Sequence, residues 1–253
     1  MEIPVRHATD DEVAFFDSHG WVRLAGLVDP GTVAALRERA TTYLEARGRE
    51  HRTLVDQAFG QSRDIAQTDD LFNAAARAMG GNAVRLLRGV EAVRIQVTNL
   101  LVKEPGEHRA TEFHQDFPWM PMDRSAMLTV WLALVDVPAD MGSLRFYNGS
   151  HRYGLLGRSF TRAGDDQLTQ HPWLKELELS PPLDLKAGDA TVHHALTVHG
   201  APANQRDTPR LSFTVTYFDA DALYTGMPYQ QTDGLGLEAN KPFDHARFPC
   251  LRP

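Results

Sequence analysis

The sequence predicts an α+β fold with a mainly β core, in which a double-sheet barrel is flanked by helices from the N-terminal part of the chain. Two observations predict this class. Apolar residues recur at helical spacing only before about residue 90, and from residue 92 onward short runs rich in Val, Leu, Thr and aromatic residues alternate with turn residues. Strands and helices do not alternate as they would in a parallel sheet, which favours a β-rich domain with a helical flank.

The first elements have clear start and stop signals. Residues 9–12 form a capping box, which predicts a short helix through Phe16 that ends at Gly20. Residues 21–28 have the composition of a strand.

Two further helices are predicted before the strand-rich region. Asp29 is placed to cap a helix whose first residue is Pro30. A third helix is predicted from about Asp69 to Met79, and we expect it to end at residues 80–81, because both are glycine and glycine commonly terminates helices.

The strands are predicted from their composition and from the turn residues between them. Turn signals such as Asn148-Gly149 and Gly188-Asp189 separate the apolar runs. The five clearest strands are residues 92–103, 126–137, 143–147, 190–198 and 211–218.

The composition excludes several classes of protein. The 253 residues are 42% hydrophobic and 23% charged, and 33 acidic against 26 basic residues give a formal net charge of −7. No basic block predicts binding to nucleic acid or to a membrane surface, and no apolar run is long enough to span a bilayer. The single cysteine, Cys250, cannot form an internal disulfide. Without a secretory pattern at the N-terminus, we expect a cytoplasmic protein, monomeric or homodimeric, whose partner is a small-molecule substrate.

One domain is expected to span residues 1–253. Its helical flank covers about residues 1–90, its barrel core about residues 91–218, and its tail residues 219–253. The tail carries aromatic residues among Gly, Pro and Asp without a regular period, so it could be a lid over a site or a surface wrap.

The segment Phe113-His114-Gln115-Asp116 places an imidazole and a carboxylate two residues apart. In an extended chain, residues i and i+2 point to the same face, so His114 and Asp116 can converge on one point. The pattern has little specificity alone, because a solvated histidine beside a strand-end aspartate has the same sequence.

Three histidines lie between Gly188 and Gly200. On a continuous strand, His193 and His199 share one face and His194 has the opposite orientation. His199 directly precedes Gly200 at the strand end, where a site at the barrel mouth would form. We interpret His193 and His194 as ordinary core or surface histidines.

Apolar and polar side chains alternate along residues 210–218. The polar set includes Arg210 and Ser212, which share one face of the strand. A guanidinium beside a hydroxyl is a good receptor for a carboxylate, since the guanidinium can bind both oxygens. The solvent-facing side of an antiparallel sheet explains the same pattern.

Considered together, the three segments predict an iron centre. Two histidines and one carboxylate with open coordination positions form the facial triad of non-haem Fe(II) oxygenases, here His114, Asp116 and His199. A 2-oxo acid and O2 can take the open positions. The distal carboxylate of that acid then requires a cation, and Arg210 follows His199 closely.

These segments and several others resemble the phytanoyl-CoA hydroxylase-like (PhyH) branch of the Fe(II)/2-oxoglutarate dioxygenases. The resemblance extends from about residue 15 to Phe218 and rests on separated blocks in matching order. The blocks are Val102-Lys103-Glu104-Pro105-Gly106, Phe113-His114-Gln115-Asp116, Val130-Trp131-Leu132-Ala133-Leu134, Gly142-Ser143-Leu144, Gly149-Ser150-His151, Gly188-Asp189, His199-Gly200 with Asn204, and Arg210. The resemblance implies a double-stranded β-helix, the jelly-roll or cupin-like barrel, and the cofactors Fe(II), 2-oxoglutarate and O2.

The resemblance also implies roles for individual residues. His114, Asp116 and His199 would bind the iron and act as the catalytic residues. Arg210 would pair with the C5 carboxylate of 2-oxoglutarate, with Ser212 assisting.

Three more residues are candidates for the cosubstrate site. Asn99 and Lys103 would share a strand face with apolar residues that include Val93 and Ile95, where buried polar groups are costly without a ligand. The resemblance directs Thr129 into the pocket as well, although cross-strand packing explains its position equally.

The substrate is expected to be a small organic molecule of biosynthetic or secondary metabolism. Phe117, Trp119 and Met120, which follow Asp116, and Trp131 are candidates for a pocket wall that favours an apolar or aromatic-contacting molecule. An ordinary core loop explains the first three residues nearly as well.

The expected reaction is hydroxylation of an unactivated C–H bond, with succinate and CO2 as coproducts. Asp116 stands where related halogenases have Ala or Gly, which favours oxygen insertion. Desaturation, cyclisation and epimerisation remain as alternative outcomes. Two other classes remain open: a non-catalytic small-molecule-binding barrel that retains the metal residues, and a zinc hydrolase in which Arg210 and Ser212 would have no role.

Overall fold

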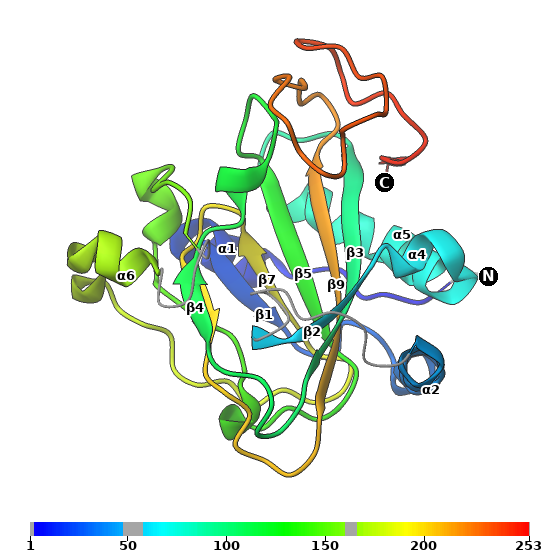
Figure 1. The fold of residues 1–253 in the computed structure, drawn as a ribbon, viewed down its shortest axis with the longest axis vertical. Coiled ribbons are helices and arrows are strands. Elements are labelled where there is room, and N and C mark those ends of the chain that lie inside the picture. The colour runs from blue at the N-terminus through cyan, green and yellow to red at the C-terminus, as the bar shows by residue number, and fades with distance from the viewer. Residues whose placement is uncertain (1–2, 48–57, 160–165, 253) are drawn as a thin grey trace.

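Two antiparallel sheets form the centre of the structure, a computed structural model that describes residues 3–47, 58–159 and 166–252 (Figure 1). The larger sheet has seven strands in the order β1-β7-β5-β9-β3-β10, with β2 also paired to β3. The smaller sheet has the order β4-β8-β6. The strands are β1 Trp21–Leu24, β2 Gly60–Arg63, β3 Val93–Lys103, β4 Thr111–His114, β5 Met127–Ala133, β6 Arg145–Phe146, β7 Ala190–His194, β8 His199–Ala201, β9 Arg210–Asp219 and β10 Cys250–Leu251.

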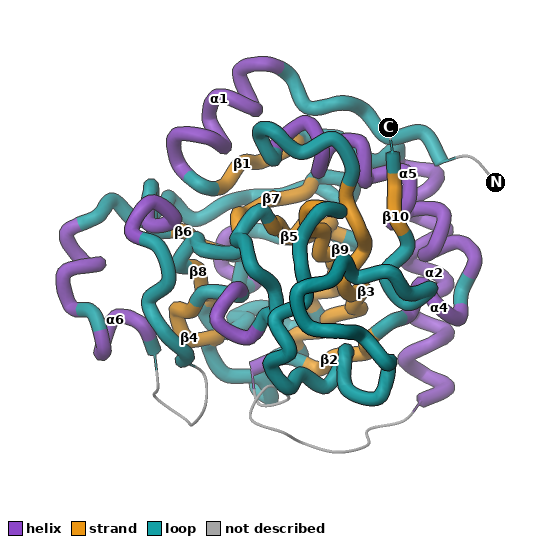
Figure 2. The backbone as a smooth tube through the Cα atoms, turned by 90° about the horizontal axis from the view of Figure 1, so that it is seen from above, coloured by secondary structure: helices purple, strands orange, loops and turns teal. Residues whose placement is uncertain are grey.

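Helices cover the outer face of the larger sheet. Seen from above, α2, α4 and α5 lie beside β3 and β10, on the side opposite the smaller sheet (Figure 2). The α-helices are α1 Asp10–His19, α2 Pro30–Arg47, α4 Ile65–Thr68, α5 Asp70–Leu86 and α6 Gln167–Gln170, and the short 3-10 helices are η1 Phe117–Trp119, η2 Ala139–Met141, η3 Ser150–Tyr153 and η4 Pro172–Glu176. This arrangement confirms the predicted class, a mainly β double-sheet barrel with N-terminal helices.

The capping signals place the first two helices as predicted. Thr9 Oγ1 accepts from the backbone N–H of Glu12 at 3.2 Å while the Glu12 carboxylate accepts from Thr9 N at 2.8 Å, so α1 begins where the capping box predicts. Asp29 Oδ1 accepts from the N–H of Gly31 and of Thr32 at the start of α2. Both helix starts follow from local hydrogen bonding, which sequence alone specifies.

Helix α5 does not end at its two glycines, so that prediction is wrong. The helix continues to Leu86, with Met79, Ala83 and Leu86 buried. A Cβ atom on Gly80 would lie 2.6 Å from Leu251 Cδ1, so this glycine allows β10 to pack closely against the helix. Burial of the helix face against the sheet therefore outweighs the local preference of glycine for a helix end.

The predicted strand at residues 190–198 is two strands in different sheets. β7 ends at His194, a turn follows, and β8 begins at His199 in the smaller sheet. The backbone N–H groups of Asp116 and Phe117 both donate to the carbonyl of Ala195 in this turn, each at 3.0 Å. The chain therefore crosses between the sheets at this point, and the crossover is tied to the segment after β4.

A β-bulge divides β3 into two halves that face opposite ways. The register with β9 shifts between Ile95 and Val97. Val93 and Ile95 consequently pack in the core beneath the helices, whereas Asn99 points to the barrel interior. The expectation that Val93 and Ile95 share a face with Asn99 and Lys103 is wrong, because a bulge inserts one residue and reverses the alternation.

Segments outside residues 91–218 also add strands to the larger sheet. β1 and β2 come from the N-terminal part and β10 from the tail. The tail arches over one end of β5, β9 and β3 (Figure 1). There Tyr224, Phe243 and Phe248 of the tail form an apolar cluster with Phe218 of β9. None of the described helices combines the length and the apolarity needed to span a bilayer.

Replacing Gly188 by alanine should destabilise the fold by about 3 kcal/mol, because its backbone has φ +97 and a Cβ would lie 2.5 Å from the carbonyl oxygen of Val28. Gly89→Ala is the matched control, since Gly89 has φ +76 but open space around it, and about 1 kcal/mol is expected there. Urea unfolding followed by circular dichroism measures both. Equal losses would mean that the contact with Val28 does not contribute.

Candidate metal centre

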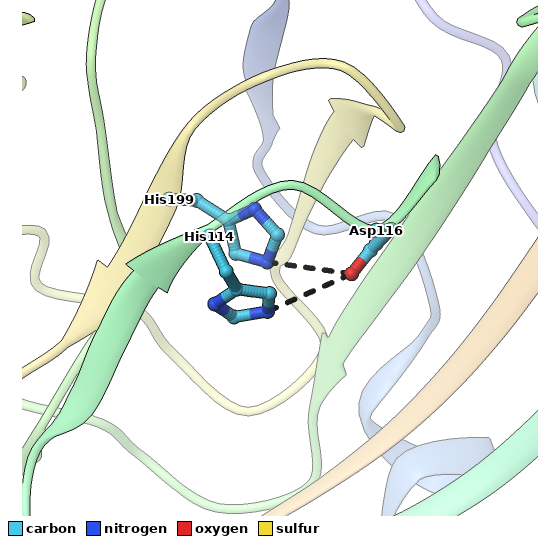
Figure 3. Close-up of side chains that lie close together, drawn as sticks. All are labelled: His114, Asp116 and His199. Carbon is cyan, nitrogen blue, oxygen red and sulfur yellow. Dashed lines mark ion pairs between the residues drawn. The ribbon is translucent and has the colours of Figure 1, made fainter. Parts of the chain in front are cut away.

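Two imidazoles and one carboxylate converge inside the barrel (Figure 3). His114 is the last residue of β4 and His199 the first of β8, and the two are register partners in that antiparallel pair. Asp116 Oδ1 lies 3.7 Å from His114 Nε2 and 3.8 Å from His199 Nε2. One donor atom from each residue lies within 4.8 Å of the others, which is close enough for a single ion to contact all three.

The convergence does not come from alternation along one strand. β4 ends at His114, and Asp116 has helical dihedrals, φ −75 and ψ −37, at the start of η1. The intervening Gln115 is anchored away from the centre, because its side-chain amide donates to Leu196 O at 2.7 Å and Gly154 O at 2.9 Å. The turn after β4 and the crossover at Ala195 together place the carboxylate.

Backbone carbonyls fix which ring nitrogen of each ligand histidine faces the centre. His114 Nδ1 lies 2.7 Å from Glu112 O, and His199 Nδ1 lies 3.0 Å from Thr197 O. A carbonyl only accepts, so each Nδ1 carries the hydrogen and each Nε2 lone pair is left for a ligand. Both histidines use the carbonyl two residues earlier, which gives them the same orientation.

The charge states also suit a divalent cation. Burial lowers the pKa of His114 and of His199, so both are neutral at physiological pH. Burial by itself would raise the pKa of Asp116, but the polar imidazole groups around it, of which His193 lies in hydrogen-bond contact, lower that pKa and keep the carboxylate ionised. Two neutral imidazoles and one carboxylate are the form of this donor set that binds metal.

Two basic side chains are buried at facing positions of β3 and β9. Arg210 is 2% exposed and Lys103 fully buried, and the two are register partners. Neither forms an ion pair with a carboxylate among the described residues. Burial and the nearby Arg210 lower the pKa of Lys103 to about 6, so the guanidinium of Arg210 carries the charge of this pair at neutral pH. A buried cation without a counter-charge is unfavourable, so the arrangement favours binding of an anion.

Arg210 retains unsatisfied hydrogen-bonding capacity. Its Nη1 donates to Gly142 O and its guanidinium lies 5.2 Å from the ring centre of Trp131, while its Nε and the Ser212 hydroxyl have no partner in the described part of the chain. Burial lowers the pKa of Arg210 to about 10, so it stays charged at neutral pH. The polar face of this strand lines a cavity, and the alternative of a solvent-facing sheet side is wrong.

The cavity has a volume of about 600 Å³ and contains the metal donors. Of the residues predicted to line it, Arg210, Asn99, Thr129, Trp119, Met120 and Trp131 do so. Three others lie behind its wall. Lys103 donates to Thr111 Oγ1 and Pro202 O, Ser212 is buried next to Arg210 on the strand, and Phe117 packs against the apolar cluster of the tail.

Several lining residues were missed by sequence reasoning. Gln96 is turned inward by the bulge in β3, and its amide donates to Tyr229 Oη at 3.1 Å and to Gln231 of the tail. Its own carbonyl oxygen has no partner in the described chain. Neither the bulge nor the path of the tail has a sequence signal. Arg158 also lines the cavity, and its guanidinium lies 4.7 Å from the ring centre of Trp119.

One further histidine lies against the metal donors. His193 Nε2 is 3.2 Å from Asp116 Oδ2, and its ring centre is 4.1 Å from that of His199. The sequence analysis places His193 on the same face as His199 but interprets it as an ordinary core or surface histidine, so its contact with Asp116 was not predicted.

Comparison with known proteins identifies the family of this chain. The phytanoyl-CoA dioxygenase (PhyH) family model matches residues 16–212. Phytanoyl-CoA dioxygenase 1 of Oryza sativa subsp. japonica is 23% identical over 257 residues, covering 86% of this chain and 92% of the relative.

Two solved structures are similar over almost their whole length. The non-heme alpha ketoglutarate dependent carbocyclase SnoK from nogalamycin biosynthesis superposes with a TM-score of 0.83 at 29% identity, covering 96% of each chain. The epimerase SnoN, in complex with Fe3+, alpha ketoglutarate and nogalamycin RO, superposes with a TM-score of 0.79 at 30% identity, covering 96% of this chain and 98% of SnoN.

Replacing Lys103 by methionine should stabilise the protein at pH 7. Burial, with Arg210 nearby, lowers the pKa of Lys103 to about 6, whereas the unfolded chain has a pKa of about 10.4. Between these values the unfolded state binds one more proton, so rising pH favours the folded wild type. The stability advantage of Lys103→Met should therefore shrink by roughly 2.5 kcal/mol from pH 7 to pH 9.

Urea unfolding at a series of pH values measures this difference. Lys186→Met is the control, because Lys186 is exposed beside Asp136, which raises its pKa, so its effect should not vary over the same range. A constant difference for Lys103→Met would show that the lysine is protonated in the folded protein throughout.

Proposed function

Because the chain belongs to the phytanoyl-CoA dioxygenase family, we propose that it is an Fe(II)/2-oxoglutarate-dependent oxygenase whose iron is held by His114, Asp116 and His199. The observation that carries the proposal is the combination of two features in one cavity. A metal-competent donor set lies there together with Arg210, a buried cation that has no acidic partner in the described chain.

The metal and the cosubstrate supply the oxidation. When bound, iron with 2-oxoglutarate and O2 would supply the oxidation of an unactivated C–H bond, with succinate and CO2 as coproducts of the 2-oxo acid. The chain supplies positions and charge. His114, Asp116 and His199 would hold the ion in the cavity that Arg210 also lines.

Arg210 and its neighbours bind the cosubstrate. We assign the far carboxylate of 2-oxoglutarate to Arg210, whose free Nε and adjacent Ser212 hydroxyl are donors without partners in the described chain. Lys103, behind Thr111, would gain a proton and add positive charge once a dianion binds beside it. Asn99 offers an unpartnered amide oxygen on the cavity wall. Thr129 acts through Asp116, to which its hydroxyl donates at 3.1 Å.

The substrate is a small organic molecule of biosynthetic metabolism. Trp119, Met120 and Trp131 give the cavity an apolar wall, and Gln96 with Tyr229 gives it a polar end. A cavity of about 600 Å³ suits a molecule of drug-like size. SnoN, which binds nogalamycin RO, supports a natural product as the class of substrate.

Hydroxylation is the primary outcome that we propose, and ring closure or epimerisation is the second candidate. The second candidate is favoured by the similarity to SnoK, a carbocyclase, and SnoN, an epimerase. The composition of the product distinguishes them. Hydroxylation adds an oxygen atom, ring closure or desaturation removes two hydrogen atoms, and epimerisation leaves the formula unchanged.

Purified protein should form succinate from 2-oxoglutarate only when Fe(II) and O2 are both present, and substrate should accelerate it. His199→Ala should lower the rate at least about 100-fold, because it removes one of three metal donors. Succinate is measured by mass spectrometry with isotope-labelled 2-oxoglutarate. A protein that binds neither Fe(II) nor 2-oxoglutarate would be a non-catalytic barrel, and hydrolysis with zinc alone would indicate a hydrolase.

Arg210→Met should weaken 2-oxoglutarate binding by about two to three orders of magnitude while Mn(II) binding changes little. Removal of one partner from a buried ion pair costs about 3–5 kcal/mol. Arg210→Lys should give a smaller loss, since an ammonium group cannot bind both carboxylate oxygens in parallel. Isothermal titration with Mn(II)-loaded protein measures both constants.

Arg158→Met is the matched control, because Arg158 lines the same cavity but lies over Trp119. Its affinity for 2-oxoglutarate should stay close to that of the wild type. An equal loss in the two variants would overturn the role given to Arg210.

A further inference from the structure

The two oxygens of Asp116 have different surroundings. Oδ1 faces His114 Nε2 and His199 Nε2, the two nitrogens left free for a metal. Oδ2 instead lies 3.1 Å from the hydroxyl of Thr129 and 3.2 Å from Nε2 of His193. One oxygen is thus directed at the ion and the other is held by the protein.

The sheet register explains why two side chains reach the same oxygen. Thr129 in β5 and His193 in β7 are register partners, and Thr216 in β9 faces Thr129 on its other side. Facing residues of antiparallel strands have Cβ atoms about 4.5–5.5 Å apart and point to the same face. The hydroxyls of Thr129 and Thr216 lie 3.0 Å apart, so a polar row crosses three strands and ends at the carboxylate.

The polarity of the contact identifies the donor. An ionised carboxylate can only accept, so the hydrogen between His193 and Asp116 must be on His193 Nε2. His193 Nδ1 is buried and has no hydrogen-bond partner in the described chain, so Nε2 is the ring nitrogen that the protein engages. His193 is 2% exposed, and its ring packs against those of His199 and Phe146, with ring centres 4.1 Å and 5.6 Å away.

From this geometry we infer that His193 is a positioning residue of the metal centre. Its Nε2–H holds Oδ2 of Asp116, together with the hydroxyl of Thr129, and so keeps Oδ1 turned toward the two ligand histidines. A carboxylate without these donors can rotate about its Cβ–Cγ bond and lose that orientation. The inference rests on the proposed iron site, since it assigns His193 a role only toward a ligand of that metal.

The expected consequence is weaker metal binding with an intact fold. Partners that orient metal ligands typically contribute a factor of about 10–100 in metal affinity. His193→Phe keeps a ring of similar size but removes the donor, so the dissociation constant for Mn(II) should rise by about 10-fold or more. His193→Gln places an amide N–H near the former Nε2 and should restore affinity to within about threefold of the wild type.

The probe is Mn(II) alone, titrated into metal-free protein and followed by electron paramagnetic resonance, with the thermal midpoint of unfolding recorded for each variant. His194→Asn is the matched control. His194 is the next residue of the same strand, has the opposite orientation and lies beside His151. Its Nδ1 accepts from the N–H of Leu196 at 3.1 Å, and the amide oxygen of asparagine keeps an acceptor at that place, so this replacement should leave the Mn(II) constant unchanged.

The outcomes separate this inference from the proposed function. If the wild type binds no Mn(II), the metal site itself fails. If the wild type binds and His193→Phe binds equally well, the metal site stands and the positioning role of His193 is wrong. A loss that His193→Gln does not restore, or one that His194→Asn shares, would indicate packing rather than hydrogen bonding and would also overturn the inference.

A double replacement tests whether the two donors act on one oxygen. Thr129→Val removes the hydroxyl at nearly constant shape. Because both groups orient the same carboxylate, the losses in Mn(II) affinity from Thr129→Val and His193→Phe should not add in the double variant. Strict additivity would mean that His193 influences the metal independently of Asp116, contrary to the inference.

Discussion

The metal site depends on one crossing point of the backbone. The carbonyl of Ala195 accepts from two successive amides, those of Asp116 and Phe117, and so joins the turn between β7 and β8 to the segment that follows β4. This junction brings the carboxylate to two histidines that start and end neighbouring strands of the smaller sheet. Every group that orients the ligands, from the carbonyls of Glu112 and Thr197 to the side chain of His193, acts on a geometry that the crossing has already set.

The same barrel accepts unfavourable electrostatics at its centre. Arg210 and Lys103 face each other without an acidic partner in the described chain, and burial lowers the pKa of both. The buried charge of Arg210, and the proton that Lys103 must give up on folding, reduce stability unless an anionic ligand is bound. An apolar core that includes Phe72 and Phe213, with ring centres 4.8 Å apart on the helical side of the sheet, offsets this cost. Binding of a dianionic cosubstrate at Arg210 would then stabilise the folded state, because the ligand binds only the folded protein.

Sequence reasoning succeeded where the causes are local. The capping box fixes the start of α1, and the alternation in residues 210–218 correctly separates core from cavity in β9. The donor residues could be named because their chemistry restricts them to few types. The bulge between Ile95 and Val97 and the end of β7 at His194 could not be predicted, since both depend on the pairing partners of the strand. As a result Gln96 was missed. His193 was placed on the correct face, but its contact with Asp116 depends on the pairing of β5 with β7, which the sequence does not specify.

The two halves of the cavity have different structural origins, and this bears on how related chains reach different products. The metal donors and Arg210 belong to strands or to segments tied to them, whereas Tyr229 and Gln231 come from the tail, which has no regular secondary structure over the cavity. SnoK and SnoN share this fold and yet are a carbocyclase and an epimerase. Once a hydrogen atom is removed, the outcome depends on which substrate atoms lie next to the reacting carbon. Changes in the tail and at Gln96 alter that placement while leaving the strands that hold the metal untouched, so the outcome can change without a change in the oxidising centre.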